Sequence, residues 1–472
     1  MDEFAGYHAL GCAAHPLSQQ FHVFREGCGQ YGLAPPLLGV SLPLRSYLYI
    51  GSLPVLPFYP FWKVLDDPVA VRVQGSLFLF AAVLLAARLV GTSWPRAALA
   101  AFVFPLFVGS FLVDTGPVGL QLLMLVATLI LLKRAASPGA SPIRDAAIAG
   151  FLCFLGIWIK LVFVWLVPAV VAYGVWQFLR RPPRIFRLAS VAFLACLLAP
   201  SAALLLSRDA EGRAYYEVLS VGRFSLEPQS IGTVASGLFA YVRNGSSLAP
   251  RSLFFPASWM DWIPSAIAAA ILIAGLVGER RRDVGVWIGA AALTFGVTIL
   301  SGRALASHHL AFTMAFVFLA IGASVAGMAR SALTTAGALV ALFWASLLLR
   351  APAASADPHS NASKDQLLEW IRSEGLDKTT VQLHASWGTY YIAHLFGDRD
   401  EIVLFARKFA REPDYLAAAR DLARAQRRSI LLITCEPQRF RPDVVEKHLG
   451  PPVAERQFGN WRALEYRPPA AS

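Results

Sequence analysis

The chain opens on two adjacent carboxylates, Asp2 and Glu3, with Tyr7 and His8 close behind them. A carboxylate held next to a hydroxyl group can take its proton as a general base, which is the chemistry that group transfer onto an alcohol requires. Alternatively, the two acids are solvated residues at an exposed terminus. The pair gains chemical meaning only if other parts of the chain complete a site around it.

The groups that could complete such a site are cations spread along the chain. They are Arg45, Lys63, Lys160, Arg303, His308 and His309. Side chains of this kind bind phosphate groups through charge-assisted hydrogen bonds. Lys160 separates two apolar runs, where its ammonium group either extends to a membrane surface or faces a polar cavity. The two adjacent histidines at the edge of another apolar run need polar partners, which favours a contact with the phosphate or sugar of a ligand.

The composition places these residues in a membrane protein. The chain has 472 residues, of which 56% are hydrophobic and 15% are charged, and its mean hydropathy is +0.53. Soluble proteins average roughly 45–50% apolar and about 25% charged residues. The surplus of apolar side chains must face lipid, which excludes a soluble single-core protein and a disordered chain.

We predict ten membrane-spanning helices, because a bilayer core of about 30 Å requires on the order of 20 helical residues. Their ranges are 68–90, 97–113, 117–133, 145–159, 161–179, 185–206, 263–278, 284–300, 305–327 and 331–349. The two runs that meet at Lys160 are either separate spans or one longer kinked element. Together the spans define a membrane domain over residues 68–350, with a long loop at 207–262.

The charged loops between these spans sort into two sets. The first set carries Arg88, Arg96, Lys133, Arg134, Arg144, Arg180, Arg181, Arg184, Arg187, Arg280, Arg281, Arg282 and Arg330. Basic loops lie on the cytoplasmic side of a membrane, so the opposite ends of the spans, residues 1–67 and the C-terminal segment are expected outside the cytoplasm. Residues 1–350 carry a net charge of +11 and residues 351–472 a net charge of +1. The positive excess therefore sets orientation and does not indicate nucleic-acid binding.

The first 67 residues are expected to form an external loop. Residues 44–72 (LRSYLYIGSLPVLPFYPFWKVLDDPVAVR) are aromatic, rich in proline and dotted with cations, a pattern typical of interfacial helices. No signal-peptide pattern precedes the loop to export it. The simplest expectation is a missing upstream helix, lost to a misassigned start codon or a truncated gene; the alternative is a true external tail.

The pattern changes beyond the membrane domain. Residues 351–363 (APAASADPHSNAS) are expected to form a linker. Residues 364–472 alternate between helical and strand patterns and predict an external α/β domain with a partly parallel sheet. The expected elements are helices 364–374, 387–396 and 413–427, strands 379–384, 401–405 and 429–434, and a hairpin of 453–458 with 461–467.

The order of several short motifs resembles the GT-C superfamily of membrane glycosyltransferases. The motifs are the Asp-Glu pair, Y-x-G-x-L at Tyr49, Gly51 and Leu53, Pro60, the D-P-V-A-V-R run, and Asp114-Thr115-Gly116-Pro117-Val118 in the second external loop. The chain is most similar to bacterial members related to protein O-mannosyltransferases and lipid A aminoarabinose transferases. The likeness covers residues 1 to about 350 and lies in the order and membrane side of the motifs.

The resemblance implies a sugar donor linked to polyprenyl phosphate, and transfer that inverts the anomeric carbon. It implies that Asp2 is the base that deprotonates the acceptor hydroxyl, with Glu3 orienting Asp2 or the acceptor. The cations would receive the lipid phosphate. Asp114 would help to position acceptor or donor; the alternative is a solvated turn residue. This chemistry requires no metal ion, although Asp2, Glu3, Asp114 and the histidines could hold a divalent cation.

The sequence thus predicts an α-helical, polytopic, GT-C-like glycosyltransferase of a bacterial inner membrane, with a periplasmic or extracellular C-terminal domain. Its partners would be membrane lipids, the polyprenyl-phosphate sugar and a lipid, glycan or protein acceptor. One alternative is a transporter or flippase of a lipid-linked or anionic substrate, although the spans contain almost no acids to line a pathway. Another is a non-catalytic scaffold of the same architecture that only presents the C-terminal domain.

Overall fold

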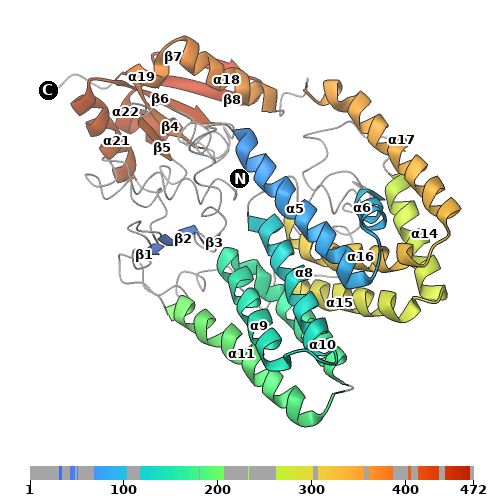
Figure 1. Cartoon of the computed structure of the whole chain (residues 1–472). Coiled ribbons are helices and arrows are strands. Elements are labelled where there is room, and N and C mark those ends of the chain that lie inside the picture. Colours follow the sequence, from blue (N-terminus) through green and yellow to red (C-terminus); the bar gives the residue numbers. More distant parts are fainter. Residues whose placement is uncertain are drawn as a thin grey trace.

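The computed structural model consists of a bundle of long helices and a smaller domain built on a sheet (Figure 1). It describes residues 31–33, 43–47, 50–51, 68–103, 117–179, 181–206, 232, 262–300, 307–355, 361–385, 402–405, 413–434 and 442–467. The C-terminal domain lies beside the end of the bundle at which the first long helix begins (Figure 1).

The helices of the bundle coincide with the apolar runs of the sequence. They are α5 (Pro68–Val90), α6 (Trp94–Val103), α8 (Pro117–Ala135), α9 (Pro142–Ile159), the 3-10 helix η1 (Leu161–Leu166), α10 (Val167–Phe178), α11 (Pro183–Leu206), α14 (Ile263–Val277), α15 (Arg281–Leu300), α16 (Ser307–Ala326) and α17 (Arg330–Ser355). Several begin at or beside a proline, which suits the first helical turn because that turn leaves backbone N–H groups unpaired anyway.

Four described helices are long and apolar enough to cross a membrane by themselves. They are Pro142–Ile159, Leu161–Phe178, Pro183–Leu206 and Arg281–Leu300. A fifth crossing is possible if α5 and α6, bent by 114° to each other, act as one span. The helices thus agree with a multi-pass membrane protein, while the full count of ten spans stays a prediction.

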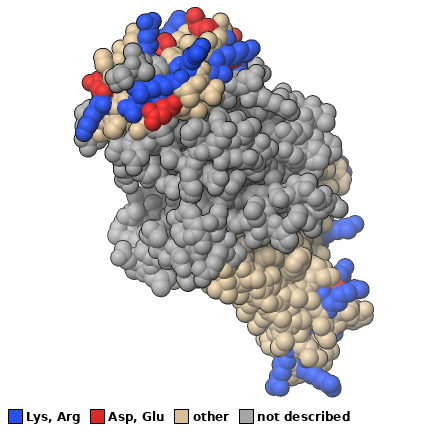
Figure 2. Space-filling view, turned by 90° about the vertical axis from the view of Figure 1, so that its left-hand side faces the viewer, with Lys and Arg blue, Asp and Glu red and all other residues tan. Residues whose placement is uncertain are grey.

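The described basic residues of the first charge set lie together at one end of the bundle and form a basic cluster, in which Lys133 and Arg96 bind helix ends. Lys133 Nζ donates to the carbonyl of Leu89, 2.7 Å away near the end of α5. Arg96 Nη1 donates to the carbonyl of Ala326, 2.8 Å away at the end of α16. A cation at a helix C-terminus satisfies free carbonyls and interacts favourably with the helix dipole. Figure 2 shows Lys and Arg at the end of the bundle that lies away from the C-terminal domain.

A buried acid joins the same end of the bundle. Asp145, 1% exposed at the start of α9, accepts hydrogen bonds from Arg134 Nε and Nη2 at 2.6 and 2.7 Å. It also accepts one from Arg144 at 3.3 Å. Two-point binding of an arginine to a carboxylate fixes geometry as well as charge. The contact holds the α8–α9 connection, and both arginines remain largely exposed at 52% and 66%.

Helices α9 and α11 make a close crossing that depends on Gly150. A Cβ atom at this position would lie 2.2 Å from the backbone oxygen of Phe193 in α11 and 2.9 Å from its carbonyl carbon. Because the obstacle is backbone, no side-chain rotation relieves it. The sequence places a glycine where two helix backbones meet.

Gly150→Ala is expected to destabilise the protein by about 1–3 kcal/mol or more, the usual cost of overpacking. The matched control is Gly289→Ala in α15, where a Cβ meets nothing within 4 Å. That change should be neutral or slightly stabilising because alanine favours helix. Melting of the detergent-solubilised chain, followed by size-exclusion fluorescence, checks both. Equal melting temperatures for the two variants would contradict this account of the crossing.

The first segment of the chain corrects one expectation. Its described residues form a small antiparallel sheet of β1 (Tyr31–Leu33), β2 (Pro43–Tyr47) and β3 (Ile50–Gly51), in that order. The prediction of interfacial helices is therefore wrong for 44–47 and 50–51. Aromatic and β-branched residues near prolines favour extended backbone over helix, and a hairpin satisfies their backbone groups by pairing.

The C-terminal domain contains a five-stranded mixed sheet in the order β5-β4-β6-β8-β7. Its strands are β4 (Thr380–His384), β5 (Ile402–Phe405), β6 (Ser429–Thr434), β7 (Ala454–Phe458) and β8 (Trp461–Tyr466), and its helices are α18 (Asn361–Ser373), α19 (Leu376–Thr379), α21 (Pro413–Gln426) and α22 (Pro442–Leu449). Strands β4, β5 and β6 are parallel, whereas β8 is antiparallel to β6 and β7. Alternate strand residues such as Val381, Leu383 and Leu432 form the core with Leu416 of α21.

This sheet confirms the expected strands to within a residue or two and the partly parallel pairing. Two boundaries differ: α17 continues to Ser355 and α18 begins at Asn361, so helix occupies much of the expected 351–363 linker. Helix α22 was missed, although Val445 and Leu449 are spaced for one helix face and both are buried. The expected helix 387–396 lies outside the described residues.

Candidate functional site

A break in the helical backbone at Lys160 organises the other end of the bundle. Helix α9 ends at Ile159, Lys160 is extended (φ −158°, ψ 124°), and η1 begins at Leu161. The chain then reverses, because Ala146 near the start of α9 and Phe178 at the end of α10 line one common pocket. The structure therefore favours two separate helices over one kinked element, with Lys160 at their junction.

Gln121 of α8 holds this junction together. Its Nε2 donates to the carbonyls of Gly156 at 2.8 Å and Lys160 at 2.6 Å. Carbonyls at a helix end need such donors when they are buried. Gln121 is fully buried, and its Oε1 has no hydrogen-bond partner in the described part of the chain. Gln121 was not predicted as a site residue, although a single glutamine in an otherwise apolar run is a sequence signal for it.

The tight reversal also depends on Gly156. A Cβ atom there would lie 2.7 Å from the ring of Phe163 in η1. The absence of a side chain lets η1 fold back against the last turn of α9. Phe163 is fully buried in this contact, so the position of Lys160 is set by packing on both sides of it.

The Lys160 side chain is buried, with 2% of its surface exposed. The sequence left two interpretations of Lys160, and this conformation does not agree with the one in which the ammonium extends to the membrane surface. An enclosed lysine is strongly destabilising unless polar or anionic groups surround its ammonium. The side chain is therefore set inside the protein at the end of the bundle opposite the basic cluster.

Strand β3 lies against α9 (Figure 1). Strand β2 pairs with β3 so that Arg45 is opposite Gly51. The backbone of Arg45 is thus held one strand away from the helix that ends at Lys160. Two of the predicted cations, nearly 120 positions apart in sequence, come from neighbouring elements. The sequence placed them on one side of the membrane but gave no reason for this pairing.

His308 and His309 lie in the first turn of α16, and this helix contacts η1. A ladder of aromatic rings sets the register: Tyr173 of α10 stacks on Trp287 of α15 at 4.9 Å, and Trp287 stacks on Phe316 of α16 at 6.4 Å. Helices α10 and α16 both run away from the Lys160 end. The elements that carry Lys160 and the two histidines therefore begin at the same end of the bundle.

The remaining predicted site residues, Asp2, Glu3, Lys63, Asp114 and Arg303, lie outside the described residues. The structure thus brings together the backbone elements of four predicted residues and leaves the carboxylates as predictions. Within the described ranges, no three His, Cys, Asp or Glu side chains are grouped as metal ligands. The acids of the alternative metal site are not among those ranges.

The fold and this end of the bundle define a multi-pass membrane protein with a mixed-sheet C-terminal domain. No family model matches the chain, and no curated protein is similar to it. Among solved structures, it resembles ArnT from Cupriavidus metallidurans bound to undecaprenyl phosphate, at 13% identity, with 98% of this chain and 93% of the other covered and a TM-score of 0.44. The apo form of that protein matches at 12% identity, the same coverages and a TM-score of 0.35.

These likenesses are in line with the resemblance stated from the sequence motifs. Identities of 12–13% with TM-scores below 0.5 do not assign an activity to this chain. The chemistry has to be argued from the chain's own residues.

Proposed function

We propose that the protein is a glycosyltransferase of a bacterial inner membrane that uses a polyprenyl-phosphate sugar as donor. The observation that supports it is the buried Lys160 at the break between α9 and η1. Its ammonium lies inside the bundle at the end opposite the basic cluster, where the positive-inside rule puts the outer leaflet. A lipid-borne phosphate is an anion that reaches this depth because its prenyl chain stays in the bilayer.

The neighbouring elements supply what a phosphate and a sugar need. Helix η1–α10 and helix α16 both begin at this end, so their positive dipole ends favour an anion. Gln121 Oε1 is a buried acceptor without a partner among the described residues. A ligand hydroxyl that donates to this oxygen would satisfy it. Arg45, His308 and His309 lie on the elements around it and would contact phosphate or sugar.

The proposed reaction is a single inverting displacement. The acceptor oxygen forms a bond to the anomeric carbon while the bond from that carbon to the phosphate oxygen breaks. Asp2 takes the hydroxyl proton, and polyprenyl monophosphate leaves with its negative charge stabilised by Lys160 and the nearby cations. Glu3 orients Asp2 or the acceptor, and Asp114, Lys63 and Arg303 help to position substrates. The C-terminal domain would face the periplasm or exterior.

The test uses the purified full-length chain in nanodiscs with a panel of undecaprenyl-phosphate sugars and extracted envelope lipids, glycans and proteins as acceptors. The expected result is release of undecaprenyl phosphate in step with glycosylated acceptor, from at least one donor. Binding of donors without any release, together with movement of the lipid between leaflets of vesicles, would support a flippase instead. If neither donor binding nor release of undecaprenyl phosphate is detected, the result would support the non-catalytic scaffold.

A further inference from the structure

Helices α10 and α11 are joined by a short turn yet diverge from it. Helix α11 packs along α9, whereas α10 packs along α8 and α15. The close α9–α11 crossing at Gly150 draws α11 away from α10. A groove remains between the two helices in the half of the bundle near the basic cluster.

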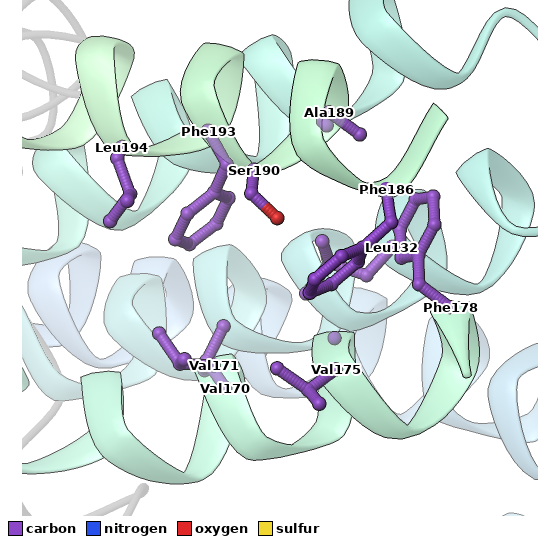
Figure 3. Close-up of a pocket in the computed structure, with 12 residues that line it drawn as sticks. Leu132, Val170, Val171, Val175, Phe178, Phe186, Ala189, Ser190, Phe193 and Leu194 are labelled. Carbon is purple, nitrogen blue, oxygen red and sulfur yellow. The ribbon is translucent and has the colours of Figure 1, made fainter. Parts of the chain in front are cut away.

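The groove is small and apolar. Its volume is about 120 Å³. Its walls come from α8, α9, α10 and α11, and Figure 3 shows Val171 and Val175 facing Phe193 across it. Ser190 contributes the one hydroxyl among the lining side chains of the described pocket. An engineered cavity of about 150 Å³ with similar walls stays dry and binds benzene, so a groove of this size suits several methylene groups rather than water.

The groove opens sideways toward the surface that faces lipid. Val171, Val175 and Leu194 line it and are 38%, 41% and 43% exposed. Toward the turn, Phe178 and Phe186 narrow it with their rings 6.2 Å apart. An acyl chain can therefore enter the groove from the bilayer along the helices, with the polar end of the lipid directed to the turn between α10 and α11.

The turn at the end of the groove carries a cation with unused hydrogen-bonding capacity. Arg181 Nε donates to the carbonyl of Ala136 at 2.6 Å. Its Nη2 is buried and has no hydrogen-bond partner in the described part of the chain. Arg184 and Arg187 on the next turns are exposed. The described acid nearest in sequence to the groove wall, Asp145, is already bound by Arg134 and Arg144.

From this combination we infer that the groove between α10 and α11 binds one acyl chain of an anionic phospholipid of the cytoplasmic leaflet, with the headgroup phosphate on Arg181. The charge is complementary, because Arg134, Arg144, Arg181, Arg184 and Arg187 lie close in sequence to the lining residues, whereas the acids Asp145 and Asp283 at this end are each already paired with arginine. The lipid would fill the gap that the diverging helices leave and would hold the α10–α11 turn in place. This site is at the opposite end of the bundle from Lys160 and does not depend on the proposed transfer reaction.

The test measures lipid binding to the delipidated full-length chain by native mass spectrometry. The probes are palmitoyl-oleoyl phosphatidylglycerol and phosphatidylcholine with the same chains. Ser190→Phe fills the groove, and Val191→Phe is its matched control because Val191 is 65% exposed and does not line the groove. Arg181→Gln removes the headgroup cation, and Arg330→Gln is its control, an exposed cation at the start of α17. Ser190→Leu replaces the phenylalanine variant if that fails to fold.

The expected result is tighter binding of phosphatidylglycerol than of phosphatidylcholine. Arg181→Gln should weaken the binding of phosphatidylglycerol about fivefold, which corresponds to about 1 kcal/mol per basic residue at a membrane surface. The binding of phosphatidylcholine should be unchanged. Ser190→Phe should weaken both lipids, while both controls bind like the parent. Equal binding by Ser190→Phe and Val191→Phe, or no preference for the anionic lipid, would overturn the proposal. Displacement of phosphatidylglycerol by undecaprenyl phosphate alone would assign the groove to a prenyl chain instead.

Discussion

Asp2→Asn is expected to reduce sugar transfer by roughly 10²–10⁴-fold, the usual contribution of a general base. Asparagine has the size of aspartate but cannot accept the hydroxyl proton at neutral pH, so the change removes basicity while keeping shape. The rate is measured as release of undecaprenyl phosphate from the donor identified in the panel. Binding of the donor should be unchanged, because the base acts on the acceptor.

Two comparisons make this result specific. Glu3→Gln is expected to have a smaller effect, since Glu3 orients a group and does not take the proton. The rate of the unaltered protein should fall as the pH is lowered through the titration of the base, and Asp2→Asn should lose that dependence. An unchanged rate in Asp2→Asn would remove Asp2 as the base while leaving the glycosyltransferase proposal to be tested with other carboxylates such as Asp114.

Lys160→Met is expected to lower the rate of transfer by roughly 10²–10³-fold, as removal of one preorganised charge-stabilising group does. Methionine keeps the length of the side chain without its charge. It should also weaken the binding of undecaprenyl phosphate, measured by native mass spectrometry. The melting temperature of the lipid-free protein is measured beside it, because it reports separately whether the change perturbs the fold.

The combination of lost binding with retained stability distinguishes a phosphate ligand from a structural lysine. Lys160→Arg should restore part of the binding, since it restores a cation at the same junction. Lys133→Met is the matched control at the other end of the bundle, where Lys133 binds the carbonyl of Leu89. It should lower the melting temperature slightly and leave lipid binding intact. Full binding of undecaprenyl phosphate by Lys160→Met would contradict the role proposed for this residue.

The membrane character and the order of the helices could be predicted from sequence because both depend on the hydropathy and charge of one segment at a time. A span requires a run of apolar residues whatever it packs against, and the basic loops mark one side through their own charge. In the C-terminal domain, strands such as 429–434 were predicted to the residue, since a short apolar run bounded by polar residues is sufficient to define them. The short helix Pro442–Leu449 was missed because its eight residues form little more than two turns.

What only the tertiary structure decided is which of these helices touch. The junction at Lys160 depends on Gln121, 35 positions before Gly156, and on the fit of Phe163 against that glycine. The groove between α10 and α11 exists because Gly150 lets α11 approach the backbone of α9. Contacts of this kind are made between residues far apart in the chain and depend on the shapes of both partners. Hydropathy and charge, which are read along one segment at a time, contain no information on the shape of the partner.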